Sequence, residues 1–549
     1  MARQRSHIRI YLSLFLLGLL CFGGIAAFQP RPGYIDADYY FAGGLRLARG
    51  YGFSEVFPWN YLDEPQSLPK PSHTYWNPLA SIIAALGMVI ARSASYRAAQ
   101  SGFVLLAALV PPATAALAFD LSARRGSTDS TSRATGETEA QNANPGLPPI
   151  SGLLAGMLAL LPTFLAPYLP VSDNIGAYML LGALFFLMLG RATPFSILLA
   201  GAAVGLMNLA RSDGMLWAGA GIFVMVLQSR GKGARAAVTQ IAIFTVGYLM
   251  TMAPWFARNL LVLGSPLPPG NAHVLWLAQY YDTFAYPATR LTWQNWLASG
   301  WEAILEARVS ALLSNSLETI LQIGGILLPF MLLGGWVHRR DARVPAALLI
   351  WVVTFGTMTA LFPFAAERGS YGHATAALLP LGWALVPDGL EAVARAAERR
   401  GWKSSHRIRR ELPVYLLIFT AALTLGLTIL YLAPPRRGQD PTRYQEVEQR
   451  IVQDQAQVCP VPCPAEAPAL LAVNPPLYYT LNNRPALMIP HEDRQAVLQL
   501  AAKFGARYLL LEEGFIYSDD LVAVYDNPAG DPNFALIADW GDAKLFRIR

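Results

Sequence analysis

Two carboxylates stand in the segment Asp36-Ala37-Asp38-Tyr39-Tyr40, directly after the first long apolar run of the sequence. Acids spaced i, i+2 just outside a bilayer can supply a general base and, beside it, a metal ligand or a group that orients an acceptor. Acidic residues are also common in the first turn of a solvated helix. Spacing leaves both interpretations open. Asp36 is the leading candidate for a base or an acceptor-orienting residue, and Asp38 is a candidate catalytic residue that supports it or holds a metal.

A cation and an imidazole follow in the segment Lys70-Pro-Ser-His73-Thr-Tyr75-Trp76. A lysine as a fixed cation and a histidine as a tunable donor suit the phosphate of a lipid at the membrane surface. A lysine that snorkels toward the headgroups is an equally good explanation. Lys70, His73 and Tyr75, together with Tyr40, are candidate substrate-binding residues.

Two short turns between later apolar runs carry charges. Asp173 is either a catalytic acid or the N-cap of the helix that follows. Arg211 and Asp213 occupy the equivalent turn of the next pair of runs, where a local ion pair between them is the simplest structure. We take Asp173 as a candidate catalytic residue and Arg211 as a candidate binding residue.

Further cations lie at the ends of two other runs. Arg258 follows Pro254 and Trp255, whereas Arg368 and His373 share one polar segment. Several cations that converge on one face would form a receptor for a phosphate or pyrophosphate. Arg258, Arg368 and His373 therefore complete the set of candidate binding residues.

Long apolar runs must position these residues. Of the 549 residues, 54% are hydrophobic and only 14% are charged, which is typical of a membrane protein. The first run follows a basic N-terminus and is interpreted as an uncleaved helix. The runs predict a mainly α, polytopic helical membrane bundle with about eleven crossings, at residues 10–28, 98–119, 150–169, 175–189, 195–210, 215–227, 238–254, 320–337, 345–362, 374–386 and 413–432.

The apolar segment 77–90 decides the topology. If it crossed the bilayer, the later basic loops would lie outside, against the positive-inside bias. As a juxtamembrane helix it keeps those loops in the cytoplasm, so we expect that it does not cross. Residues 29–97, 255–318 and the region from 433 onward then lie on the extracytoplasmic, periplasmic side, and the candidate site with them.

The two extracytoplasmic loops are rich in aromatic residues, which anchor helices among lipid headgroups and can stack on sugar rings. The net charge of +6 comes from basic residues spread between the apolar runs, so we interpret it as a topology signal and expect no nucleic-acid partner. The aromatic residues are Trp59, Tyr61, Tyr75 and Trp76 in the first loop, and Trp255, Trp276, Tyr280, Tyr281, Trp293, Trp296 and Trp301 in the second.

The region from 433 to 549 is soluble in composition, and we expect a small α/β domain there behind a transmembrane domain at 1–432. Segments 470–473, 508–511, 535–538 and 544–547 predict strands, and 492–504 predicts a helix. Cys459 and Cys463 favour a small disulfide loop over a structural zinc site. The polar stretch 121–149 predicts a flexible cytoplasmic loop.

Together these residues resemble the GT-C class of polytopic glycosyltransferases, in particular the family of protein O-mannosyltransferases and lipid A aminoarabinose transferases. Asp36 and Tyr40 match the first and last positions of that family's Asp-Glu-x-x-Tyr motif, with Ala37 in place of the second acid. Lys70-Pro71 followed by Tyr75-Trp76 looks like its Lys-Pro-x-x-x-Tyr-Trp stretch. Asp173 looks like the family's second acid, and the segments of Arg258 and Arg368 fall where relatives carry similar residues.

The resemblance implies an inverting transfer from a polyprenyl-phosphate sugar to a glycan, lipid or protein acceptor in the cell envelope, at a bacterial inner membrane. A divalent metal, if one is used, would be held by Asp36, Asp38 and Asp173. A transporter or flippase of lipid-linked saccharides is the alternative, and it would need charges in mid-helix along a path across the bilayer. A non-catalytic scaffold that binds a partner through its C-terminal domain is a third hypothesis.

Overall fold

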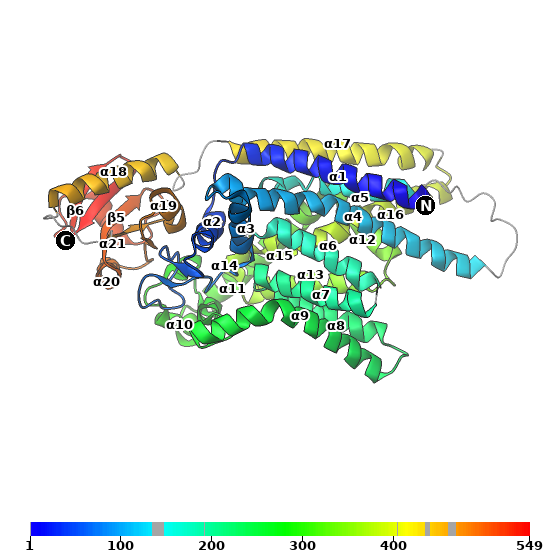
Figure 1. Ribbon diagram of the computed structural model, residues 1–549, viewed down its shortest axis with the longest axis horizontal. Helices are drawn as coiled ribbons and strands as arrows, with labels where there is room; N and C mark the ends of the chain where they lie inside the picture. The colour runs from blue at the N-terminus through cyan, green and yellow to red at the C-terminus, as the bar shows by residue number, and fades with distance from the viewer. Residues whose placement is uncertain (1, 134–147, 192, 403–404, 434–439, 459–467) are drawn as a thin grey trace. The chain divides into compact units, whose positions relative to one another are not determined.

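The computed structural model describes residues 2–133, 148–191, 193–402, 405–433, 440–458 and 468–549 (Figure 1). The chain forms two compact units, and each is assembled from separate stretches of the sequence. Unit 1 contains Met1–Pro30, Gln100–Trp255 and Arg308–Ala433. Unit 2 contains Arg31–Ala99, Phe256–Ala307 and Pro434–Arg549. The predicted division at residue 432 stays a prediction; the last stretch of unit 1 ends at Ala433, and unit 2 includes most of both aromatic-rich loops.

Unit 1 is a polytopic helical bundle, as the apolar runs predict. Helices suit a lipid core because they satisfy every backbone N–H and C=O group within the segment. Among the described residues, seven helical stretches are long and apolar enough to cross a membrane. They are Ser6–Ala27, Tyr96–Arg124, Ala234–Leu263, Trp301–Val337, Arg343–Ala360, Pro363–Arg399 and His406–Leu432.

The other four predicted runs form shorter apolar helices: α5 (Pro148–Ala159), α6 (Ile175–Arg191), α7 (Pro194–Ala210) and α8 (Gly214–Gln228). The run at 150–169 is not one helix, because the chain leaves α5 and turns into the 3-10 helix η1 (Thr163–Tyr168). Pro162 and Pro167 lie at the start and inside of η1, and proline has no N–H to continue an α-helix.

The predicted loop at 121–149 begins later than expected, because α4 (Tyr96–Arg133) continues as helix to Arg133. Residues 134–147 lie outside the described residues. The remaining helices of this part of the chain are α1 (Ala2–Ala27), α9 (Ala234–Leu263), α11 (Trp301–Glu318), η5 (Thr319–Gly324), η6 (Gly325–Leu327), α12 (Leu328–Val337), α13 (Arg343–Ala360), α14 (Pro363–Ala365), η7 (Ala366–Ser370), α15 (Tyr371–Thr375), η8 (Ala376–Leu378), α16 (Leu379–Arg399) and α17 (Ser405–Leu432).

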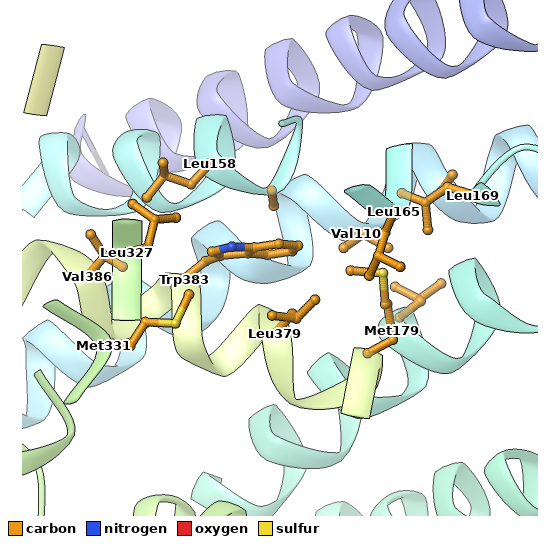
Figure 2. Packing of buried hydrophobic residues seen from close by; sticks show 14 of the residues in the cluster. Val110, Leu158, Leu165, Leu169, Met179, Leu327, Met331, Leu379, Trp383 and Val386 are labelled. Atoms are coloured by element: carbon orange, nitrogen blue, oxygen red, sulfur yellow. The ribbon is translucent and has the colours of Figure 1, made fainter. Parts of the chain in front are cut away.

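The core of unit 1 is centred on Trp383 of α16, which is 3% exposed. Figure 2 shows its indole ring in the middle of the apolar cluster, with Leu158, Leu327 and Leu379 around it. Glycine lets α12 approach α16 closely: a Cβ built on Gly334 would lie 2.1 Å from the carbonyl oxygen of Leu385. Close backbone approach at small residues is how membrane helices gain dispersion contacts without a hydrophobic driving force.

Unit 2 contains a five-stranded mixed sheet with the order β4-β3-β5-β7-β6. The strands are β3 (Ala469–Ala472), β4 (Ala486–Met488), β5 (Ala506–Glu512), β6 (Phe534–Asp539) and β7 (Ala543–Ile548). The first two pairings, β4 with β3 and β3 with β5, are parallel, and the other two are antiparallel. The helices of this region are α18 (Pro441–Val458), α19 (Pro475–Asn482), α20 (Arg494–Phe504) and α21 (Asp519–Asp526), four of the labelled helices in Figure 1.

The predicted strands at 470–473, 508–511, 535–538 and 544–547 are confirmed as β3, β5, β6 and β7, and the predicted helix at 492–504 is α20. The small α/β region is therefore present. Three helices, α18, α19 and α21, and the short strand β4 were not predicted. Cys459 and Cys463 lie outside the described residues, so their predicted disulfide stays a prediction.

The first loop contributes α2 (Ile35–Ala48), the short strands β1 (Ser54–Glu55) and β2 (Lys70–Pro71), and α3 (Leu79–Ala91) to unit 2. The stretch after β1 continues the sheet at its β4 edge, where the N–H groups of Ala486 and Met488 donate to the carbonyl oxygens of Val56 and Pro58, both at 3.0 Å. The segment 77–90, which decides the predicted topology, forms most of α3. The second loop adds η2 (Pro269–Trp276), η3 (Tyr280–Phe284), η4 (Ala288–Arg290) and α10 (Trp293–Ala298).

Candidate functional site

The acidic motif lies in the first turn of α2, where the positive end of the helix dipole stabilises both carboxylates. Consecutive helical residues differ by about 100° around the axis, so Asp36 and Asp38 point to opposite sides of the helix. Asp36 is half-buried, whereas Asp38 is 1% exposed. The two carboxylates therefore have different surroundings and are suited to different tasks.

Asp38 is held by the C-terminal part of unit 2. The Nδ2 group of Asn474 donates to Asp38 Oδ2 at 2.9 Å. Burial raises the pKa of the Asp38 carboxyl to about 7, although the Asn474 bond and the charge of Arg31 act in the opposite direction. Asp38 Oδ1 is buried and makes no hydrogen bond among the described residues. An ionised Asp38 is thus costly here, and the Asn474 bond offsets part of that cost.

Lys70 lies at the centre of a buried charge cluster. The antiparallel pairing of β1 with β2 places Glu55 opposite Lys70, and the Nζ atom lies 3.3 Å from Glu55 Oε1 and 2.7 Å from Asp63 Oδ2. Its third contact is a 3.3 Å hydrogen bond to Thr74 Oγ1. Burial alone would lower the pKa of Lys70, but the two carboxylates raise it above its usual value. The ammonium is 4% exposed, so its charge organises the loop.

His73 is fully buried and both of its ring nitrogens are hydrogen-bonded. Nδ1 lies 2.7 Å from Ser72 Oγ, and Nε2 lies 2.9 Å from Ser81 Oγ. Because Ser81 donates its own proton to the Tyr40 carbonyl at 3.0 Å, His73 Nε2 carries the proton that Ser81 accepts. Burial and the charge of Arg258 lower the pKa of His73 to about 3. A neutral His73 ties α2 to α3 and does not offer a cation to a substrate.

Arg258 and the loop aromatics surround this cluster. The Arg258 guanidinium donates to the carbonyl oxygens of Phe53 and Ser72, at 3.0 and 3.2 Å. Trp59 and Trp76 stack with ring centroids 4.0 Å apart. The aromatic contacts continue through three more rings: Tyr39 lies 5.1 Å and Tyr40 6.0 Å from Trp76, and Tyr75 lies 5.0 Å from Trp59.

Unit 1 gathers a second polar group from four different helices or turns. His373 Nδ1 lies 3.9 Å from Asp173 Oδ2. Arg211 pairs with Asp213 through Nε at 2.9 Å, as the local ion pair expected from the sequence, and its Nη2 donates to the Ser370 hydroxyl at 3.0 Å. Asp173 is 1% exposed, whereas the His373 and Arg211 side chains are 18% and 12% exposed. This group combines acids and cations at a partly open position.

Arg368 lies close in sequence to Ser370, at a kink where Gly369 has a φ of +94°. A positive φ suits glycine, and the turn leaves the Arg368 side chain exposed. Sequence reasoning missed the acid next to this turn, Glu318, which is 8% exposed. A Cβ on Gly372 would lie 2.1 Å from Glu318 Oε1, so the glycine is what admits the carboxylate there.

The structure thus brings the predicted residues together in two sets. Asp36, Asp38, Tyr40, Lys70, His73, Tyr75 and Arg258 belong to unit 2, and Asp173, Arg211, Arg368 and His373 belong to unit 1. Sequence reasoning missed Asn474, Glu55 and Asp63. The buried Lys70 could have pointed to the two acids, because it needs nearby counter-charges, but no local signal marks an asparagine so far along the chain.

A metal site is not assembled by the described side chains. In the part of the chain that the structure describes, no group of three or more His, Cys, Asp or Glu residues could hold a metal ion. Asp36 and Asp38 diverge around α2, which does not bring their carboxylates to one ion. The residues present therefore do not fit the metal set that the sequence left open.

No protein-family model matches this sequence, and no curated protein matches it either. Solved structures do match, and they show that the chain has the fold of the GT-C class, in agreement with the resemblance noted in the sequence. The helical bundle of unit 1 and the loop-and-sheet assembly of unit 2 are both within the matched region.

The matching structures include ArnT, an aminoarabinose transferase of Cupriavidus metallidurans. Its apo form matches at a TM-score of 0.57 and 11% identity, over 100% of this chain and 98% of that one. Its complex with undecaprenyl phosphate matches at 0.55 and 13%, over 98% and 97%. The oligosaccharyltransferase AglB of Archaeoglobus fulgidus, in complex with an inhibitory peptide and a dolichol-phosphate, matches at 0.52 and 12%, over 91% and 69%.

Proposed function

We propose that this protein is a glycosyltransferase of a bacterial inner membrane that moves a sugar from a polyprenyl-phosphate donor to an envelope glycan, lipid or protein on the extracytoplasmic face. The fold, shared over the whole chain with a transferase that was solved with undecaprenyl phosphate, is the main support. The acidic turn of α2 and the polar group of Asp173, Arg211 and His373 add residues suited to this chemistry.

Asp36 is the proposed general base or acceptor-orienting group. It is half-buried in the first turn of α2, so its carboxylate can meet an acceptor hydroxyl. The acceptor oxygen loses its proton to Asp36 and bonds to the anomeric carbon from the face opposite the phosphate. The bond from that carbon to the phosphate oxygen then breaks, the configuration inverts, and polyprenyl phosphate leaves with the bonding electrons.

The cations stabilise the negative charge that develops on the leaving phosphate. Arg368 is one candidate, since its side chain is exposed at a turn, and Arg211 and Arg258 are the others. The Asp173 carboxylate lies 3.9 Å from His373 Nδ1 and can orient the imidazole, so that a ring N–H of His373 is directed toward the phosphate. Lys70 acts indirectly in this proposal, because its ammonium already pairs with Glu55 and Asp63.

The proposal predicts that Asp36→Asn abolishes transfer while the protein still inserts in the membrane. Loss of a general base costs about 10²- to 10⁴-fold in rate. The purified protein in detergent would be given a panel of undecaprenyl-phosphate hexoses and pentoses with membrane extract as acceptor, and labelled product would be measured. A transporter makes no covalent product in micelles, so this assay also separates the two functions.

Asp519→Asn is the matched control, because Asp519 is an exposed acid in the first turn of α21. It should leave the transfer rate unchanged. If Asp36→Asn behaves like this control, Asp36 is only a solvated helix-terminal acid. Mass spectrometry of envelope glycans and lipid-linked sugars, with and without the protein, would identify the sugar and the acceptor.

A further inference from the structure

The C-terminal region of unit 2 contacts the acidic motif through the side chain of Asn474, which donates to Asp38. We propose that Asn474 is a positioning residue that fixes the first turn of α2 through its hydrogen bond to Asp38. The C-terminal α/β region would then serve the reaction by setting the direction of Asp36. This inference rests on the proposed function, but it concerns a contact that can be measured without any substrate.

The hydrogen bonds of Asn474 leave only one orientation for its amide. The oxygen Oδ1 accepts from the N–H of Leu477 at 3.1 Å and so caps the N-terminus of α19. The nitrogen Nδ2 therefore faces Asp38 and donates to it at 2.9 Å. The main-chain N–H of Asn474 donates to the Tyr444 hydroxyl at 3.3 Å. With its side chain and backbone both engaged, and 3% exposed, Asn474 is a rigid anchor.

The rest of α2 is held by the same region. Arg46 of α2 donates to the hydroxyl of Tyr479 in α19 at 3.3 Å. Arg49, at the C-terminal end of α2, donates to Asn483 Oδ1 at 2.9 Å. The N-terminal end of α2 has no side-chain cap of its own, since Tyr34 occupies the N-cap position without such a bond. Asn474 is therefore one of the contacts that fix the end of the helix where the motif lies, beside the bonds of the Tyr39 hydroxyl to Glu55 and to the N–H of His73.

Burial explains why Asp38 is assigned a role in positioning α2, and Asp36 the contact with substrate. A carboxylate that is 1% exposed is poorly placed to touch a substrate, whereas Asp36 on the opposite side of the helix is half-exposed to its surroundings. The charged and titratable groups that act on Asp38 are Arg31, from the segment before α2, and Tyr444, whose hydroxyl donates to Glu512 at 3.3 Å. Asp38 is thus the acceptor that joins α2 to α19.

The substitution Asn474→Asp separates the two roles of this side chain, which are to cap α19 and to donate a hydrogen bond to Asp38. Aspartate is as good an N-cap as asparagine, so α19 keeps its cap. The donor to Asp38 is lost, and two carboxylates then face each other. Because misplacement of a catalytic group by about 1 Å can cost about a hundredfold in rate, we expect kcat to fall about a hundredfold with KM within about threefold.

Rescue by a second substitution makes the test specific. Asp38→Asn removes the repulsion and supplies a new donor to an aspartate at 474. In the Asp38→Asn background, Asn474→Asp should therefore cost less than about threefold in kcat, a double-mutant coupling that loss of stability alone does not produce. Asn474→Ser, which keeps a cap but is too short to reach Asp38, should resemble Asn474→Asp without being rescued.

Hydrogen exchange measured by mass spectrometry gives a readout that needs no activity. Amide exchange in α2 (Ile35–Ala48) should be about tenfold faster in Asn474→Asp, and should return toward the wild-type rate in the double variant. Exchange in β5 should not change, which shows that the sheet is folded. Ser518→Ala is the control, because Ser518 only caps α21 in the same unit.

Two results would overturn the inference. In the first, the kcat and the rate of amide exchange in α2 are the same in Asn474→Asp as in the control variant Ser518→Ala. In the second, kcat falls but α2 stays protected and Asp38→Asn gives no rescue, so that Asp38 acts by its own charge. If the wild type transfers no sugar, the proposed function fails, and α2 exchange alone then decides the role of Asn474.

Discussion

Single residues in unit 2 show how a loop between apolar helices can keep charges away from water. Lys70 forms ion pairs with Glu55 and Asp63 at distances of 3.3 and 2.7 Å, and Tyr39 donates to Glu55 at 2.7 Å. Each buried charge therefore has partners, because an unpaired one would cost several kcal/mol. Asp38 is less fully compensated than these groups, since one of its oxygens makes no hydrogen bond among the described residues.

This imbalance at Asp38 predicts a pH dependence of stability. Its folded-state pKa is raised to about 7, whereas an unfolded aspartate has a pKa of about 3.9. The folded state holds the proton more tightly, so the stability due to this group decreases as pH rises from about 4 to about 7 and is constant outside that window.

Asp38→Asn removes this dependence. Its stability relative to the wild type should increase by roughly 2–3 kcal/mol between pH 5 and pH 8. Thermal unfolding in detergent at several pH values would measure it, with the exposed Asp519→Asn as control. Parallel stability curves for Asp38→Asn and the wild type would contradict the raised pKa.

At the scale of elements, the helices of unit 2 approach one another through small residues. A Cβ on Gly44 of α2 would lie 2.6 Å from the Cβ of Ala84 and 2.9 Å from the carbonyl oxygen of Ser81, both in α3. A Cβ on Gly43 would lie 2.7 Å from Ser81 Oγ and 3.1 Å from the His73 ring. The glycine pair therefore allows the α2–α3 contact that keeps His73 buried.

Gly44→Ala should separate these helices. The added methyl group has no room, and overpacking of this kind costs about 1–3 kcal/mol of the free energy of unfolding. Gly24→Ala in α1 is the matched control, because a Cβ there meets nothing within 4 Å. The control should be neutral or slightly stabilising, by about 0.5–1 kcal/mol. Equal unfolding temperatures for the two variants would count against the close contact.

At the scale of the whole molecule, unit 2 is assembled from three stretches that are far apart in the sequence. In the first loop, Val56 and Pro58 accept backbone hydrogen bonds from the edge of a sheet whose strands all come from the C-terminal stretch. The second loop joins them where the N–H of His491 donates to the carbonyl oxygen of Phe284 at 3.2 Å. At these places each stretch satisfies part of its polar backbone through another stretch.

A chain that ends at Ala433 should therefore lose the folded first loop. Without the C-terminal stretch, the partners of Val56, Pro58 and Asp38 are missing, so we expect limited proteolysis within residues 31–99 to be at least about tenfold faster. Cleavage in the exposed turn at Lys232, which belongs to unit 1, is the internal control and should not change. Equal resistance of 31–99 in both chains would show that the loop folds alone.

Part of this architecture was predictable because it depends on local pattern. Each of the eleven or so apolar runs is helical over all or part of its length, and four predicted strands and the helix α20 are present. Local reasoning failed where proline ended a helix, as at Pro162, and where helix continued through polar residues, as in α4 up to Arg133. The short strand β4 has too few residues to show a period.

The sequence by itself determined the class of fold and the types of residue available for chemistry, because hydrophobic runs and charged motifs are local properties. Only the tertiary structure decided how those residues are used. It buried Lys70 between two acids, made His73 a neutral link between helices, and placed Asn474 against Asp38. The Asn474–Asp38 bond joins segments hundreds of residues apart, and even the nearer partners meet only when the loop is folded. Burial and hydrogen-bond partners set the charge, direction and accessibility of each side chain.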